Sequence, residues 1–274
     1  MRRPLVPTAL AGVVALLLAA CGGGTTAADG VSAATRASAS ASAAPTAPAT
    51  LTGASFVSRT TAAMLAAGSY AFTYTASTAG TTVSGTGRFV GTSASDLGME
   101  FAVETGGSTV RMLVAAGHAY MDGALVGATG KWIDLTDAST SALSGMAQQI
   151  RDSIDPSAMF AGLGPDALTV TKGESTTIDG TAATAYRITL DVAAMAQVLG
   201  RTLSAEELDQ VKAAAGGTSM DLVYYLDAQD RPIRTTVSMG TFMTQEMRYS
   251  GFGTQAPITP PAAADVIPAS QLGL

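Results

Sequence analysis

The chain has 274 residues, and its 15 Lys and Arg against 21 Asp and Glu give a formal net charge of −6. Nucleic-acid binders cluster Lys and Arg against the phosphate backbone, whereas only 13% of this chain is charged, so we expect no nucleic-acid partner. One cysteine and one histidine are too few for an internal disulfide or a structural zinc site, and we expect no metal or other cofactor.

Residues 1–20 are predicted to be a lipoprotein signal peptide. Arg2 and Arg3 precede an apolar stretch from Leu5 to Ala20, and Cys21 follows at once. A charged start, a short apolar run and small residues before the cut are what export requires. Because bacterial processing would diacylate a cysteine here, we expect Cys21 to anchor the protein on the extracytoplasmic face of the cell membrane. The alternative is an ordinary signal peptide with an incidental cysteine.

Residues 21–50 are predicted to form the lipidated cysteine and a disordered tether. Ala, Ser, Thr and Pro dominate from Thr25 to Thr50, and such a composition cannot bury enough apolar surface to offset chain entropy. A single folded domain is therefore expected over 51–274.

The first part of this domain is predicted to hold one helix and several strands. Phe56, Thr60 and Met64 recur at helical spacing before Gly68, which predicts an amphipathic helix with a glycine stop. Alternating apolar positions and short turns then favour an antiparallel meander. Its expected strands cover 70–75, 97–103, 110–114, 119–121 and 132–133.

The second part alternates helical and extended patterns. Ser204-Ala205-Glu206-Glu207 is a capping box that predicts a helix reaching Ala215. Further helices are expected over 143–154, 159–163 and 192–199, and strands over 168–171, 176–178, 186–190, 220–226, 233–239 and 243–249. Together the patterns predict an α+β fold, with one large, strongly curved antiparallel sheet and helices on one face.

Four motifs carry a resemblance to a known family. They are Lys131-Trp132-Ile133-Asp134-Leu135, the run from Asp179-Gly180 to Asp191, the run from Tyr224 to Arg234, and the closing stretch from Phe252-Gly253 to Pro261. In order and spacing they resemble the LppX/LprG lipoproteins of actinobacteria. The resemblance implies a half-barrel related to the LolA and LolB carriers, in which an antiparallel sheet wraps around short helices and encloses an apolar cavity. It also implies binding of acylated lipids or glycolipids and their transport across the cell envelope.

The candidate cavity-lining residues are the large apolar side chains of the predicted strands and helices. Twelve methionines add unbranched surface that adapts to acyl chains, although the same residues could simply fill a solid core. The candidates are Leu97, Met99, Phe101, Val103, Met112, Val114, Tyr120, Trp132, Met146, Ile150, Met159, Phe160, Leu222, Tyr224 and Met239.

The sequence offers little for catalysis. His118 lies beside the Ala116-Gly117 turn, with no Gly-x-Ser-x-Gly elbow in the chain and no spare cysteine, so we expect a surface histidine and no enzyme. The stretch from Gly85 to Gly91 approximates a dinucleotide fingerprint with the wrong spacing and is expected to be a glycine-containing strand.

Two acidic groups favour structural roles. Asp227 to Asp230 lacks the alternating ligands of a calcium loop, which leaves a solvated turn as the expectation. Asp152 and Asp155 are expected to cap and end a helix.

These patterns predict a monomeric, membrane-anchored lipid carrier, with a lipid exporter as a candidate partner. The alternative is a cell-surface interaction or sensor module that holds no lipid.

Overall fold

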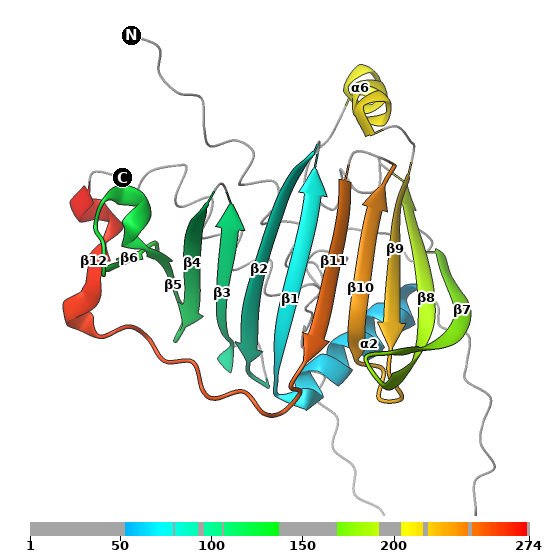
Figure 1. The fold of residues 1–274 in the computed structure, drawn as a ribbon, viewed down its shortest axis with the longest axis horizontal. Helices are drawn as coiled ribbons and strands as arrows, with labels where there is room; N and C mark the ends of the chain where they lie inside the picture. Colours follow the sequence, from blue (N-terminus) through cyan, green and yellow to red (C-terminus); the bar gives the residue numbers. More distant parts are fainter. Residues whose placement is uncertain are drawn as a thin grey trace, which may run out of the picture.

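The computed structural model describes residues 53–78, 80–92, 96–105, 107–136, 169–191, 204–215, 219–240 and 243–272 (Figure 1). The signal peptide, the tether and the helices predicted over 143–154, 159–163 and 192–199 lie outside these residues, as do Asp152 and Asp155.

The described residues form two α-helices, twelve strands and three short 3₁₀ helices. In chain order they are α2 (Gly53–Ala67), β1 (Ser69–Thr78), β2 (Thr81–Val90), β3 (Gly98–Thr105), β4 (Ser108–Ala115), β5 (His118–Asp122), η2 (Gly123–Val126), β6 (Trp132–Asp134), β7 (Thr169–Ile178), β8 (Thr181–Asp191), α6 (Ala205–Ala215), β9 (Ser219–Leu226), β10 (Pro232–Met239), β11 (Met243–Ser250), η3 (Ala263–Asp265), β12 (Val266–Pro268) and η4 (Ala269–Leu272).

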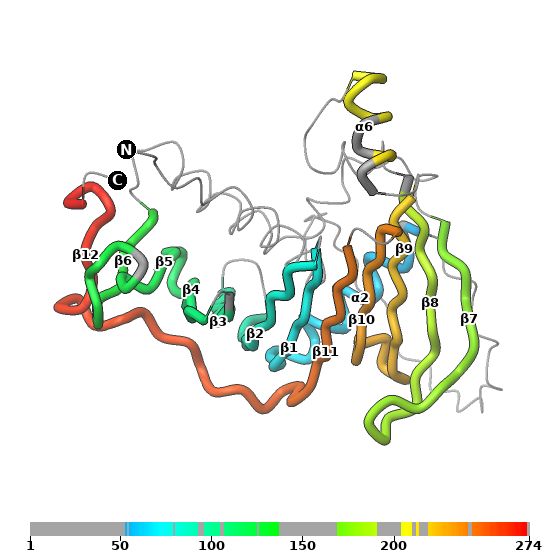
Figure 2. Tube along the Cα trace, turned by 45° about the horizontal axis from the view of Figure 1, so that its top comes forward, coloured from blue at the N-terminus to red at the C-terminus, as the bar shows by residue number. Residues whose placement is uncertain are grey.

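All twelve strands belong to one sheet, in the order β12-β6-β5-β4-β3-β2-β1-β11-β10-β9-β8-β7. The strands from β1 to β6 form one meander and those from β7 to β11 form a second. The two meanders join where β1 pairs with β11. Figure 2 shows that the strands follow a curve rather than a plane. The prediction of one large, curved antiparallel sheet is therefore confirmed.

Strict alternation divides the side chains between two faces. On β9 the burial pattern changes at every residue, and on β11 Met243, Gln245, Met247 and Tyr249 are all buried. Because paired residues share a face, the register places these side chains in rows across the strands. One row runs through Val103, Gly85, Tyr74, Met247, Thr235, Tyr224 and Tyr186. We call the buried face that carries this row the concave face.

Two glycines of β2 make room for aromatic rings on the concave face. Gly85 pairs with Tyr74 and Gly87 with Phe72. A Cβ on Gly85 would lie 2.5 Å from Cε1 of Tyr74, and one on Gly87 would lie 2.2 Å from Cζ of Phe72. The rings of β1 thus lie over the bare backbone of β2, a known way of compensating for glycine in a strand.

The two helices follow their predicted signals. Gly68, at φ +70°, ends α2, and its N–H donates to the carbonyl of Leu65 at 2.9 Å. The capping box opens α6, because the Ser204 N–H donates to Oε2 of Glu207 at 2.8 Å and the Glu207 N–H donates to Oγ of Ser204 at 3.3 Å. In the described ranges, neither helix has the length and apolar character that crossing a membrane requires.

Two features differ from the prediction. The strands expected over 168–171 and 176–178 are one strand, β7, because an irregularity between Lys172 and Ser175 shifts its register on β8 without ending the pairing. β12 was not predicted, and it pairs with β6 in parallel. A parallel neighbour needs a long connection, and here the whole second meander lies between β6 and β12. The segment from Gly251 to Ala262 then leads the chain from the end of β11 back to the β6 edge (Figure 1).

The fit of Phe72 over Gly87 predicts a specific weakness. In Gly87→Ala, the new methyl group would overlap the Phe72 ring and approach the Glu100 carbonyl, so we expect a loss of about 1–3 kcal/mol in the free energy of unfolding, measured with urea. Thr86→Ala, at the adjacent exposed position, is the control and should change stability by less than about 0.5 kcal/mol. Equal stability of the two variants would show that the close packing is not there.

Candidate functional site

The concave face is the candidate site, because it gathers most of the predicted cavity residues that the structure describes. Leu97, just before β3, is partly buried and packs against the same cluster. The others, all more than nine-tenths buried on this face, are Met99, Phe101 and Val103 on β3, Met112 and Val114 on β4, Leu222 and Tyr224 on β9, and Met239 on β10. That they bind lipid stays a prediction.

Two candidates, Tyr120 and Trp132, lie on the opposite, convex face. They pack with Leu113, Ile258 and Val266, away from the main clusters. Strand parity explains the difference: Met121 pairs with Met112 and Ile133 on the concave face, which turns its neighbour Tyr120 outward. Apolar side chains occupy both faces of β4 and β5, so hydrophobicity alone did not distinguish the two faces.

The remaining predicted site residues are not described. Met146, Ile150, Met159 and Phe160 belong to the segment 137–168, and Cys21 to the N-terminal segment.

Helix α2 packs against the concave face through aromatic contacts. The ring of Phe56 meets Tyr224 edge-on at 5.1 Å between centroids and lies 5.7 Å from Tyr186, and Phe56 is 2% exposed. The buried Thr60 hydroxyl donates to the Phe56 carbonyl at 2.9 Å, so it places no unpaired donor in the interior.

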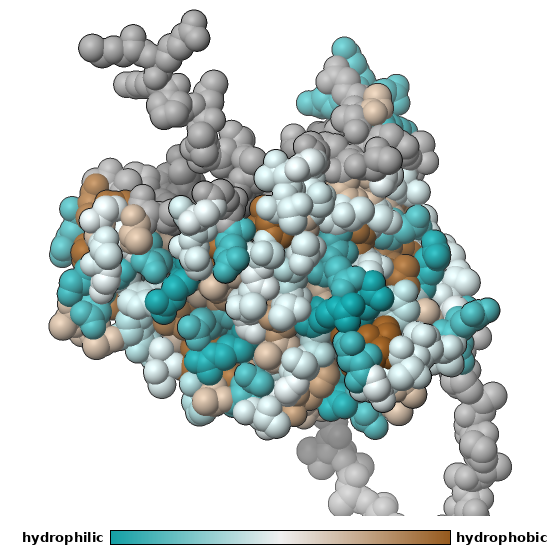
Figure 3. Space-filling view, viewed as in Figure 1, coloured by the Kyte–Doolittle hydropathy of each residue, from teal (hydrophilic) through white to brown (hydrophobic). Residues whose placement is uncertain are grey.

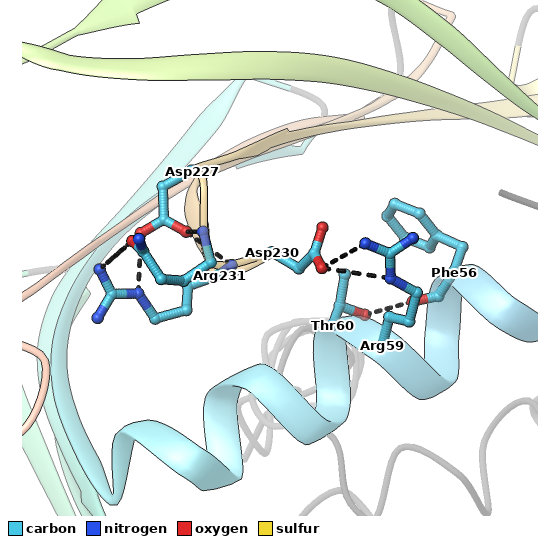
Figure 4. Close-up of polar contacts among 7 residues, drawn as sticks. Phe56, Arg59, Thr60, Asp227, Asp230 and Arg231 are labelled. Carbon is cyan, nitrogen blue, oxygen red and sulfur yellow. Dashed lines mark hydrogen bonds and ion pairs between the residues drawn. The ribbon is translucent and has the colours of Figure 1, made fainter. Parts of the chain in front are cut away.

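An ion pair fixes the same helix to the β9–β10 turn (Figure 4). Nη2 of Arg59 lies 2.6 Å from Oδ2 of Asp230, which has a left-handed backbone at φ +60°. Asp227 shapes this turn, because its carboxylate accepts from the N–H groups of Gln229 and Arg231, both at 2.9 Å, and from Nε of Arg231 at 2.8 Å. The turn was expected to be solvated, but Asp227 is 8% exposed and its hydrogen bonds replace water.

Some polar side chains on the concave face were not singled out by the sequence analysis. Tyr74, Thr235 and Gln245 are buried on β1, β10 and β11, around Met247. The Tyr74 hydroxyl has no hydrogen-bond partner in the structure as described, an arrangement that costs about 1–3 kcal/mol. Burial raises the pKa of Tyr74 well above its ordinary value, which keeps the hydroxyl neutral. Gly85 and Gly87 within a predicted strand signal a close approach to that strand, but the sequence does not say that Tyr74 is the side chain that lies there.

The lone histidine lies outside the concave face. His118 opens β5 and is exposed, as expected, and its Nδ1 lies 3.0 Å from Oδ2 of Asp134. Burial acts to raise the pKa of Asp134, but hydrogen bonds from Thr136 and His118 hold it below its ordinary value. Within the described ranges, no three His, Cys, Asp or Glu residues gather as a metal site would require.

Over β10 and β11 the convex face is polar, and ion pairs link its side chains. Strongly hydrophilic atoms lie over β11 and β10 (Figure 3), where Glu246 pairs with Arg234 and, at 2.7 Å, with Nε of Arg248. Nη1 of Arg248 also reaches Asp179, at 2.8 Å, in the β7–β8 turn. Burial acts to raise the pKa of Glu246, but these two arginines hold it below its ordinary value.

A hollow of about 280 Å³ opens on this convex face over β1 to β4. Arg88, Glu100, Arg111 and Gln255 line it. Nε of Arg88 donates to Oε2 of Glu100, and Nη1 of Arg88 donates to the Ala256 carbonyl, each at 2.9 Å. A charged hollow of this kind is unsuited to an acyl chain, so it does not compete with the concave face as a lipid site.

No family model and no curated protein significantly matches the chain. Among solved structures, it is similar to the lipoprotein LppX of Mycobacterium tuberculosis, at 10% identity over 72% of this chain and 94% of that chain, with a TM-score of 0.44. It is also similar to LprF of Mycobacterium bovis, at 12% identity over 74% and 94%, with a TM-score of 0.45. A LolA superfamily protein from Nitrosomonas europaea matches at 7% identity over 76% and 96%, with a TM-score of 0.26.

LppX and LprF are the kind of lipoprotein that the sequence motifs resemble. The likeness concerns the fold; what this chain binds depends on its own residues.

The hydrogen bonds on Asp134 predict a pH-dependent contribution to stability. Because its pKa is lowered in the folded protein, the carboxylate stabilises the fold above its ordinary pKa of 3.8, and this contribution is lost as the pH falls through the lowered value. We therefore expect Asp134→Asn to destabilise the chain near neutral pH and the deficit to shrink in acid. Urea unfolding at a series of pH values measures it, and a deficit unchanged from neutral pH to about pH 3 would contradict the assignment.

Proposed function

We propose that the chain is a membrane-anchored lipoprotein that binds acylated lipids or glycolipids against its concave face and carries them across the cell envelope. The observation that carries this proposal is the extent of the apolar surface on one face of an open sheet. Buried apolar side chains face the same way on strands from β6 through β1 to β8.

That surface is much larger than the helix that packs on it. Twelve strands at about 4.8 Å spacing span about 50 Å along the curve. The 15 residues of α2 form a rod about 22 Å long, which is anchored at Phe56 near one end of the sheet. We infer that acyl chains can pack against this face beyond the part that α2 contacts.

The chemistry of the face suits such a ligand. Methionine is unbranched and polarizable, so it packs against hydrocarbon of varied shape. Buried methionines occur across the face, at Met99, Met112, Met220, Met239, Met243 and Met247. An exposed acyl chain of 16 carbons costs about 12 kcal/mol in water, and a carrier that shields it removes most of that barrier to transfer.

The carrier needs no chemistry of its own, and we propose that it acts as a monomer. Its single histidine is held by Asp134 on an exposed strand end, far along the chain from any element of the second meander. A lipid exporter is a candidate partner for loading.

Lipid bound to the purified protein is the first test. The test uses the full chain with Cys21→Ser, which removes the protein's own acyl chains. Organic extraction and mass spectrometry should then find acyl lipid in a near-stoichiometric amount. Val103→Glu, which places a charge on the concave face, should lower the bound lipid about tenfold or more. Ala102→Glu, the adjacent residue on the convex face, is the matched control and should leave it unchanged.

Circular dichroism checks that both variants stay folded. The carrier proposal would be contradicted if the folded Cys21→Ser chain carried no lipid and took up none from added vesicles. That outcome would favour the interaction or sensor module instead.

The anchor is tested separately. In cells, Cys21→Ser should move the protein from the membrane fraction to the soluble extracytoplasmic fraction and abolish incorporation of labelled palmitate, because two acyl chains supply the membrane affinity. Ser32→Ala, in the predicted tether, is the control. Retention of the Cys21→Ser protein on membranes would show that something other than acylation holds it there.

A further inference from the structure

Tyr74 occupies a central place on the proposed binding face. Its strand, β1, stands between the two meanders, with β2 on one side and β11 on the other. On the concave face Tyr74 is flanked by Met247 of β11 and Gly85 of β2. The ring leans over Gly85, whose missing side chain leaves the space that the outer end of the ring occupies.

The hydroxyl at that end is isolated. Tyr74 is 2% exposed, and its oxygen has no hydrogen-bond partner in the structure as described. Across the sheet from Tyr74, the row continues through Gly85 on β2 to Val103 on β3, and Val103 is buried and apolar. This row therefore brings no polar side chain toward the ring from β2 or β3. Phenylalanine would fill the same space without leaving a donor unsatisfied.

The polar groups of the concave face are also uncharged. Besides tyrosines, Thr235 and Gln245 are the buried polar side chains that β1, β11 and β10 place on this face, and all of these side chains are neutral. Asp227, the one buried acidic residue among those described, belongs to the β9–β10 turn and is paired with Arg231. A neutral donor on apolar surface matches a neutral acceptor attached to hydrocarbon, and an ester carbonyl is that kind of group.

We propose that Tyr74 is a specificity-determining residue whose hydroxyl donates a hydrogen bond to the ester carbonyl of a bound acyl lipid. This inference rests on the proposed function, because it assigns one polar contact within that site. It predicts that the protein prefers ester-linked lipids to ether-linked lipids of the same shape, since the ether lacks the carbonyl and leaves the Tyr74 hydroxyl unpaired.

A competition between two lipids tests this. The full chain carrying Cys21→Ser is incubated with vesicles that hold equal amounts of dipalmitoyl phosphatidylcholine and its dihexadecyl ether analogue. The protein is then separated, and the bound lipids are extracted and quantified by mass spectrometry. We expect the ester to exceed the ether by about threefold to tenfold in this protein, the effect of one neutral hydrogen bond, and by much less in Tyr74→Phe.

Tyr120→Phe is the matched control, because it removes the same hydroxyl from a buried tyrosine on the convex face. It should keep the full ester preference. A ratio that is equal in the parent chain and in Tyr74→Phe, with lipid bound to both, would overturn the inference and leave the carrier proposal standing. Binding of neither lipid to the parent chain would overturn both.

Discussion

An open sheet with one apolar face is the constraint on which the rest of this structure depends. Side chains alternate between the faces along each strand, so the strands from β6 through β1 to β8 together form one continuous apolar face that must be buried as a unit. A closed barrel would cover that surface with its own far wall, whereas an open sheet must cover it with other material. Helix α2 covers part of it, with Phe56 against Tyr186 and Tyr224, and the extent of the apolar face beyond this helix makes it the candidate binding surface.

The two faces of the sheet are stabilised by different interactions. On the concave face the glycines of β2 let the rings of Phe72 and Tyr74 lie over the neighbouring strand, in space that a side chain would otherwise fill. On the convex face Arg248 and Glu246 link β11 to β10 and to the β7–β8 turn. Exposed pairs of this kind contribute little individually, but the pair of Arg248 with Asp179 joins segments that are 69 residues apart.

Much of the fold could be predicted from the sequence, because alternation and turn residues are local signals. The period-two patterns located most strands, Gly68 marked the end of α2, and the capping box at Ser204 marked the start of α6. β12 could not be found this way, since three residues carry no usable pattern and its pairing with β6 depends on the course of the preceding segment. Two strands were predicted where β7 is one. The residues at its register shift, Lys172 to Ser175, interrupt the alternating pattern in the sequence as a turn would.

The candidate site was less predictable than the fold. Met99, Phe101 and Met112 could be selected as large apolar residues in alternating strands, but the same rule selected Tyr120 and Trp132, which pack on the other face. Tyr74 was missed for the opposite reason. Its role depends on what surrounds the hydroxyl, and that is known only once β2 is placed beside β1.

The pairing of β1 with β11 also has a consequence for how the protein is made. Ala71 pairs with Ser250, near the far end of the domain, so the two meanders cannot join until almost the whole chain is available. Contacts so distant in sequence form late and slow folding. A chain that is made from its N-terminus therefore has all the strands of its first meander well before β11 is available to join them to the second. Its continuous apolar surface exists only after the last long strand has arrived.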